Sequence, residues 1–277
     1  MAKHIVVTGG TGFLGRHVVE TFLNEGFEVT ALVRNKSKAK DVKQLKKANI
    51  ESCEIYQKNL TYSFPPQSTL IHCAWADVQD SLSSKHLSQH LNDNYQFLSN
   101  VINQKKIKKI IVSGTCYEYG LQYGPMLSST PTRPNTPYAK AKVELHKKLL
   151  KLQSRSEFIL IWARLFYMYG EGQDEKSIIP LFEKALKNSE KVFNMSYGEQ
   201  LLDYLPVHQA AKQISSLIEK NSGTYNICSG SPISLRRLLE DKMKKMNKKI
   251  ELHTGYFPYR AEDSIAIWGG DPLKLKS

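Results

Sequence analysis

A glycine-rich turn near the start of the chain limits the possible folds more than any other feature. The segment Thr8-Gly9-Gly10-Thr11-Gly12-Phe13-Leu14-Gly15 follows the apolar run 5–7 and leads into an amphipathic helical pattern. A strand that turns through glycines into a helix gathers free backbone N–H groups and the positive end of the helix dipole, which suits a pyrophosphate. We expect Gly9 to allow the turn, Gly12 the approach of the phosphates and Gly15 close helix packing. This context favours a dinucleotide pocket over an ordinary glycine-rich turn.

The end of the second predicted strand indicates which dinucleotide is bound. Residues 27–33 are mostly apolar and end at Arg34, and no carboxylate lies between Glu28 and Asp41. A carboxylate here accepts hydrogen bonds from the ribose of NAD, whereas a basic residue pairs with the 2′-phosphate of NADP. Arg34, helped by Lys36, Ser37 or Lys38, therefore predicts a preference for NADP(H), with NAD(H) as the alternative cofactor. The competing interpretation is an ordinary charged turn.

Two later segments carry candidate catalytic groups. A predicted strand at 110–112 runs toward Thr115, and open α/β sheets bind ligands at the carboxyl ends of their strands. Tyr138 and Lys142 stand one turn apart at the start of a predicted helix, so their side chains share a face. A nearby ammonium favours the phenolate, which makes a tyrosine a usable proton donor or acceptor at neutral pH. We predict that Thr115, Tyr138 and Lys142 are catalytic.

The order of these motifs resembles the extended short-chain dehydrogenase/reductase family over residues 1–165. The likeness continues through 163–170, 198–207, 225–230 and 258–260. Tyr167 stands where the family has an asparagine, and Leu202 stands where it has an arginine, which leaves a second phosphate contact in doubt. The sequences of residues 114–120 and 258–262 are similar to those of nucleotide-sugar 4-keto-6-deoxyhexose reductases.

The resemblance implies an α/β fold in two parts. A Rossmann domain for NADP(H), with a doubly wound parallel sheet, is expected over residues 1–165 and is rejoined by 205–229. A small mixed α/β lobe that binds the nucleotide sugar is expected from 166–204 and 230–277.

The resemblance also implies the remaining site residues. Expected cofactor contacts are Gly9, Thr11, Gly12, Phe13, Leu14, Gly15, Arg34, Lys38, Asn59, Leu60, Cys73, Ala74, Trp75, Asn94, Tyr138 and Lys142. Expected substrate contacts are Trp75, Thr115, Tyr117, Tyr167, Ile179 and Arg260. We place Arg260 on the diphosphate because a guanidinium matches phosphate oxygens bidentately; the alternative is a surface arginine. Trp75 either covers the active site or merely packs, and His72 is expected to be a core histidine.

The implied reaction is NADPH-dependent reduction of the C4 ketone of a nucleotide-linked (dTDP-) 4-keto-6-deoxyhexose, which makes a deoxysugar donor for surface polysaccharide. Sugar 4,6-dehydratases of this family carry carboxylates directly after the threonine, where this chain has Cys116 and Tyr117. Glu118 comes one residue later, so in an extended segment its side chain points to the opposite side. In an irregular turn it would reach the site. A nucleotide-sugar 4-epimerase and a non-catalytic NADP(H)-sensing protein remain alternatives.

Composition argues against several other classes of protein. The formal net charge is +13, but the lysines are spread over predicted helices and turns, which favours solvated helix faces over a nucleic-acid or membrane site. The 4 cysteines lack a C-x-x-C pair, which argues against a metal site or a disulfide framework. No run approaches the ~20 apolar residues of a spanning helix, and a first strand within residues 1–8 leaves no room for a signal peptide. We expect a cytoplasmic protein that acts on a nucleotide sugar. Helices 83–104 and 138–152 correspond to those that form a dimer seam in many family members, whereas other members are monomers, so both a homodimer and a monomer stay open.

Overall fold

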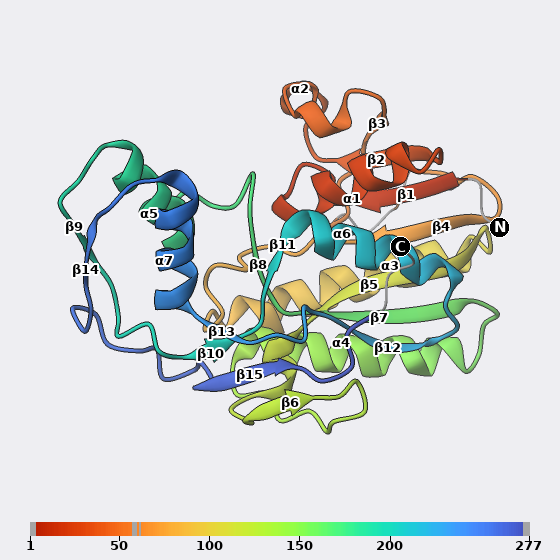
Figure 1. The fold of residues 1–277 in the computed structure, drawn as a ribbon. Helices are drawn as coiled ribbons and strands as arrows, with labels where there is room; N and C mark the ends of the chain where they lie inside the picture. The colour runs from red at the N-terminus through yellow and green to blue at the C-terminus, as the bar shows by residue number, and fades with distance from the viewer. Residues whose placement is uncertain (1–3, 57–59, 61, 274–277) are drawn as a thin grey trace.

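Within residues 4–56, 60 and 62–273, which the computed structural model describes, seven parallel strands form the main sheet (Figure 1). In spatial order they are β12 (Gly223–Ile227), β7 (Ile159–Leu165), β5 (Ile107–Thr115), β4 (Ser68–His72), β1 (His4–Thr8), β2 (Glu28–Val33) and β3 (Asn49–Ser52). The chain runs outward from β1 to β3 and then returns to place β4 on the other side of β1. A crevice opens at the carboxyl ends of the strands where the order reverses. The predicted doubly wound α/β fold is confirmed.

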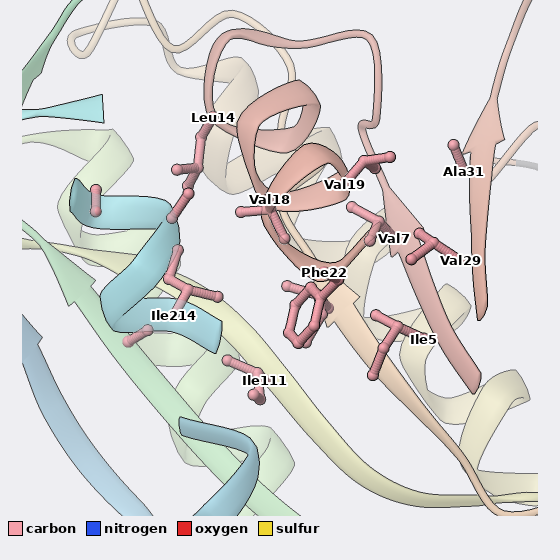
Figure 2. Packing of buried hydrophobic residues seen from close by; sticks show 14 of the residues in the cluster. Ile5, Val7, Leu14, Val18, Val19, Phe22, Val29, Ala31, Ile111 and Ile214 are labelled. Carbon is pink, nitrogen blue, oxygen red and sulfur yellow. The ribbon is translucent and has the colours of Figure 1, made fainter. Parts of the chain in front are cut away.

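Alternating side chains of the strands divide the core into two layers, because successive residues of a strand face opposite sides. Ile5 and Val7 pack with α1 (Phe13–Asn24) and α6 (Val207–Ser216), and Figure 2 shows Phe22 and Val18 of α1 beside these strand residues. Val6 faces the opposite layer, which contains α3 (Leu91–Asn103) and α4 (Pro137–Gln153). The short helix α2 (Lys36–Lys40) follows β2. Burial on both faces explains why these strands read as near-continuous apolar runs.

A smaller lobe stands beside the carboxyl ends of the main sheet (Figure 1). Its sheet has the order β13 (Ile233–Ser234), β10 (Leu201–Leu202), β15 (Ala266–Gly269) and β6 (Gly124–Met126). Around it lie the helices α5 (Ile178–Lys187) and α7 (Leu235–Met246) and the strand pairs β8 (Tyr167–Tyr169) with β11 (Tyr204–Pro206) and β9 (Val192–Asn194) with β14 (Glu251–His253). The strand β6 belongs to this sheet although it lies within residues 1–165, so the lobe borrows a piece of the predicted Rossmann segment.

Two predicted elements have different boundaries in the structure. Strand β5 begins at Ile107, three residues before its predicted start, and its buried Lys109 donates hydrogen bonds to the carbonyl oxygens of Ile218 and Lys220. These bonds satisfy the ammonium that interrupts the apolar pattern. The predicted helix 83–104 begins as a π-helical turn (His86–His90) and continues as α3. Among the described residues no helix is both long and apolar enough to cross a bilayer.

Candidate active site

The glycine turn has the close contacts that its sequence predicts. Gly9 has a φ of +69°, and a Cβ there would lie 2.9 Å from the backbone nitrogen of Ala74. A Cβ at Gly15 would lie 2.1 Å from the carbonyl oxygen of Gly9, so the helix packs against the turn itself. The backbone N–H of Gly12 donates to that same oxygen at 2.8 Å. Side chains are therefore excluded from the places where a pyrophosphate needs direct access to the backbone.

A cavity of about 180 Å³ lies against this turn. The predicted cofactor residues that line it are Gly9, Thr11, Gly12, Arg34, Cys73, Ala74 and Trp75. The sequence pattern of residues 51–56 predicts a short third strand, but Cys53, Ile55 and Tyr56 also line the cavity. Strand β3 ends at Ser52, and the residues that follow turn into the wall. The rule that ligands lie beyond the carboxyl ends of strands would have identified them.

The other predicted cofactor residues lie away from the cavity wall. Phe13 and Leu14 pack in the core layer of α1, Leu60 packs in the opposite layer, and Lys38 is exposed on α2. Asn59 lies outside the described residues.

Asn94 is fully buried behind the cavity. Its amide oxygen is 2.8 Å from Nε2 of His72, and its amide nitrogen donates to the carbonyl oxygen of His90 at 2.7 Å. The other nitrogen of His72 lies 2.8 Å from Oγ1 of Thr8, next to the glycine turn. Burial lowers the pKa of His72 to about 3, so the ring stays neutral. His72 is thus a core histidine, as predicted, and Asn94 supports the site without lining it.

The structure brings Thr115, Tyr138 and Lys142 together. Thr115 is the last residue of β5, and its side chain hydrogen-bonds to that of Tyr138, the second residue of α4. The helix starts here because Thr136 caps it by accepting from the N–H of Ala139 and Pro137 occupies its first position. Lys142 lies one turn later and donates from Nζ to the carbonyl oxygen of Ser113 at 2.8 Å. All three side chains of the predicted catalytic set are buried.

Burial shifts the acid–base behaviour of this set in opposite directions. It raises the pKa of Tyr138 well above its usual value; Glu118 and Cys116 add to this, and the hydrogen bond to Thr115 opposes it. Burial lowers the pKa of Lys142 to about 7, against the opposing charges of Glu118 and Cys73. The expected lowering of the Tyr138 pKa by Lys142 is not among these influences, because the ammonium is directed at Ser113 and lies 5.8 Å from the centroid of the phenol ring. Tyr138 is therefore held as a neutral phenol.

The carboxylate of Glu118 is held by buried donors beside the catalytic set. Residues Cys116–Tyr119 form a 3-10 turn, so the expected extended geometry is wrong. The carboxylate of Glu118 accepts from the backbone N–H of Thr115, Nε1 of Trp162 and Nε of Arg164 at 2.8–2.9 Å. These buried donors, and not strand alternation, determine the direction of its side chain.

The predicted substrate residues are placed unevenly. Tyr117 and Tyr167 contact each other with ring centroids 5.9 Å apart, and Tyr117 donates its hydroxyl to the carboxylate of Asp263 at 3.0 Å. Asp263 was missed, although it lies just beyond the matched segment 258–262. Arg260 is exposed near Asp263 and holds down the carboxyl pKa that burial raises. Ile179 is 3% exposed and packs in the core of the lobe, so it presents no surface to a substrate.

Comparison with known proteins gives four relevant likenesses. The model of the NAD dependent epimerase/dehydratase family matches residues 5–228. The dTDP-6-deoxy-L-talose 4-dehydrogenase (NAD(+)) of Aggregatibacter actinomycetemcomitans is 32% identical over 271 residues, which is 96% of this chain and 99% of the relative. The solved UDP-N-acetylglucosamine 4-epimerase of Methanobrevibacter ruminantium M1 has a TM-score of 0.81 at 24% identity, covering 99% of this chain and 93% of that one. The UDP-glucose 4-epimerase of Thermotoga maritima has a TM-score of 0.79 at 20% identity, covering 96% and 89%. The two solved structures show a shared fold.

Proposed function

Because the chain belongs to the NAD-dependent epimerase/dehydratase family, we propose that it uses NADPH to reduce the C4 ketone of a nucleotide-linked 4-keto-6-deoxyhexose. The resemblance seen in the glycine motif and the Tyr-x-x-x-Lys pair is thus confirmed at the level of the family. The observation that carries the proposal is the buried set Thr115, Tyr138 and Lys142 beside the glycine-lined cavity. The relative is named as a 4-dehydrogenase, which supports C4 as the reacting carbon. An enzyme that oxidises an alcohol also catalyses the reverse reduction, so the name is compatible with reduction of a C4 ketone.

The glycine turn suits the pyrophosphate of a dinucleotide because its backbone is bare where phosphates need access. A Cβ at Gly9 would meet the backbone of Ala74, and Arg34 lines the same cavity. When bound, a reduced nicotinamide supplies the hydride. The protein's task is then to place a proton donor at the carbonyl oxygen. Tyr138 donates that proton as the neutral phenol that burial maintains, and Thr115 hydrogen-bonds the same oxygen.

The direction of Glu118 supports reduction over dehydration. Removal of water across C5 and C6 needs an acid for the hydroxyl and a base for the C5 proton. Cys116 and Tyr117 occupy the positions where dehydratases of the family carry carboxylates, and the carboxylate of Glu118 is bound by Arg164 and Trp162. The three residues after Thr115 therefore present no free carboxylate to the substrate.

The decisive experiment follows the cofactor during turnover. We expect one NADPH to be oxidised for each nucleotide 4-keto-6-deoxy sugar reduced, measured from the absorbance of reduced nicotinamide over a panel of such sugars. A 4-epimerase or a dehydratase recycles its cofactor, so product formed without net oxidation would exclude a reductase. Binding of NADPH without turnover of any sugar would favour a sensing protein.

Substitution of Tyr138 tests the proton donor. Tyr138→Phe should lower kcat by about 100- to 1000-fold, because loss of a donor to a developing alkoxide costs about 3–4 kcal/mol. Affinity for NADPH, measured by titration calorimetry, should persist. The control is Tyr95→Phe, because Tyr95 also lies under a lysine, with Nζ of Lys148 5.2 Å from its ring, but lines no part of the cavity. Equal activity of Tyr138→Phe and the wild type would remove Tyr138 from the mechanism.

The preference for NADP(H) depends on Arg34 and the residues beside it. The talose dehydrogenase relative does not support it, because that enzyme is named for NAD(+). A charge-assisted pair with the 2′-phosphate is worth ~1.5–3 kcal/mol, or roughly ten- to a hundred-fold in affinity. We expect NADPH to bind more tightly than NADH by this factor and Arg34→Ala to remove most of the difference. Arg236→Ala is the matched control, because the Arg236 guanidinium does not line the cavity and is paired with Glu199 and Glu240 at 3.2 Å. Equal affinities of the wild type for both cofactors would show that Arg34 does not select the cofactor.

A further inference from the structure

The segment after β4 folds over both Tyr138 and Lys142. The backbone N–H of Tyr138 donates to the carbonyl oxygen of Ser81 at 3.1 Å, and the buried ring of His86 lies 5.1 Å from the Tyr138 ring. Trp75, at the start of the same segment, lies 6.0 Å from Tyr138 in an edge-on arrangement. Two aromatic side chains from one segment therefore contact the predicted proton donor.

Hydrogen bonds fix both the tautomer and the orientation of His86. Its Nε2 is 2.8 Å from the carbonyl oxygen of Asp80, which only accepts, so Nε2 carries the proton. In a neutral ring Nδ1 is then an acceptor, and it receives the indole N–H of Trp75 at 3.1 Å. The two rings are also stacked, with an angle of 27° between their planes. His86 thus holds the indole at its only polar atom.

Trp75 joins the cavity to the buried lysine. Trp75 is one of the residues that line the cavity, and Nζ of Lys142 lies 4.0 Å from the centroid of its ring. A cation held over an indole face away from water is stabilised by the ring's quadrupole. Lys142 also donates a hydrogen bond to the carbonyl oxygen of Ser113. The indole therefore sets one side of the space into which the ammonium can reach.

We propose that His86 is a positioning residue that holds the Trp75 indole over Lys142, and that this pair forms the wall against which the nicotinamide end of the cofactor binds. The identity of the ligand rests on the proposed function, since the reacting ring must lie beside Tyr138, whose ring is 6.0 Å from that of Trp75. The geometry of the pair itself does not depend on that function.

Protonation of His86 would undo this arrangement, because Nδ1 would then present an N–H to the indole N–H. The titratable groups that act on His86 or contact its ring are Asp77, Asp80 and His90 from its own segment and Tyr138 from α4. Asp77 is bound to Nε2 of His90 at 3.0 Å, so it is directed away from His86. Burial lowers the pKa of His86, partly opposed by the bond to Asp80, so the neutral form prevails at pH 7. The wall is expected to loosen in acid.

The first test measures the accessibility of Trp75 without any nucleotide. Acrylamide quenching of Trp75 is obtained as the difference between each protein and its Trp75→Phe counterpart, which removes the signals of Trp162 and Trp268. His86→Leu should raise the quenching constant of Trp75, whereas His86→Asn, whose amide oxygen can still accept the indole N–H, should restore shielding. His146→Leu is the matched control, because His146 stacks on Trp162 at 4.5 Å instead of Trp75. In the wild type the same constant should rise as the pH falls below about 6.5, the ordinary histidine value, and in His86→Asn it should not.

The second test measures NADPH affinity by titration calorimetry in the same variants, with thermal unfolding as the check of folding. His86→Leu should bind about fivefold to tenfold more weakly, the scale of one lost hydrogen bond, and His86→Asn should bind close to the wild type. Unchanged shielding of Trp75 in His86→Leu would overturn the proposal, as would a released Trp75 with unchanged affinity. A failure of His86→Asn to restore both would also overturn it. If the wild type binds neither NADPH nor NADH, the proposed function fails, while the quenching result still decides whether His86 holds Trp75.

Discussion

The surroundings of Lys142 disfavour the charge of its ammonium group. It is 1% exposed, and burial lowers its pKa to about 7 from an ordinary 10.5. Its three N–H donors are turned to one carbonyl oxygen and one indole face, so water does not solvate the ammonium. A buried lysine of this kind lowers the stability of the folded chain at neutral pH.

This environment predicts a pH dependence of stability. Between pH 7 and 10.5 the unfolded chain binds a proton at Lys142 that the folded chain has lost, so the free energy of unfolding should rise with pH by up to ~1.4 kcal/mol per unit. Lys142→Met removes this contribution, so urea unfolding from about pH 7 to about pH 9 should show a steeper rise for the wild type than for the variant. Lys147→Met, on the exposed side of α4, should leave the slope unchanged. Parallel slopes for wild type and Lys142→Met would contradict the lowered pKa.

The 3-10 turn after β5 is held to the main sheet by one buried ion pair. Glu118 is 0% exposed and closes a capping box with Thr115, while Arg164 of β7 holds its carboxylate from the neighbouring strand. Arg164 also donates to the hydroxyl of Tyr119 and the carbonyl oxygen of Ser128. The turn that presents Thr115 and Tyr117 is therefore fixed to the sheet by buried polar bonds.

Breaking this pair should cost far more than breaking an exposed one. Arg164→Met leaves a buried carboxylate without its cation, which should lower the free energy of unfolding by about 3–5 kcal/mol. Lys36→Met breaks a pair in which both side chains are nearly half exposed, and it should cost about 0–1 kcal/mol. Urea unfolding at neutral pH measures both values. Similar costs for the two variants would show that the Glu118 carboxylate is not bound as the structure indicates.

Local sequence signals predicted these elements unevenly. Thr136 and Pro137 mark the start of α4, because an N-cap hydroxyl and a proline at the first position act within one turn. The π-helical turn that carries His86 has no such signal, and its side chains are held by contacts with Trp75 and Asp80. The strand predicted over residues 51–56 lies at Asn49–Ser52 in the structure. The prediction missed by two residues or more because the short polar pattern of this strand fits several registers.

Across the whole molecule, one buried carboxylate joins the lobe to the main sheet. Asp203 accepts the backbone N–H groups of Ser229, Gly230 and Gly269 at 2.7–3.1 Å, so it ties together segments far apart in the sequence. Leu202, next to it, is 5% exposed and packs in the apolar cluster of Cys116, Tyr119 and Ile267. The position where the family has an arginine is thus part of the core between the two parts, and Leu202 offers no phosphate contact.

Features that depend on short stretches of backbone could be predicted from the sequence. The glycine turn, the apolar strands that flank it and the one-turn spacing of Tyr138 and Lys142 follow from φ angles, side-chain alternation and helix geometry, which act over a few residues. Three features could be seen only in the tertiary structure. They are the direction of the Glu118 side chain, the contact of Asp263 with Tyr117, and the position of Trp75 between His86 and Lys142. Each of these joins side chains from separate elements. Their meeting depends on which strands are neighbours and on how buried polar groups find partners, and no local pattern encodes either of these.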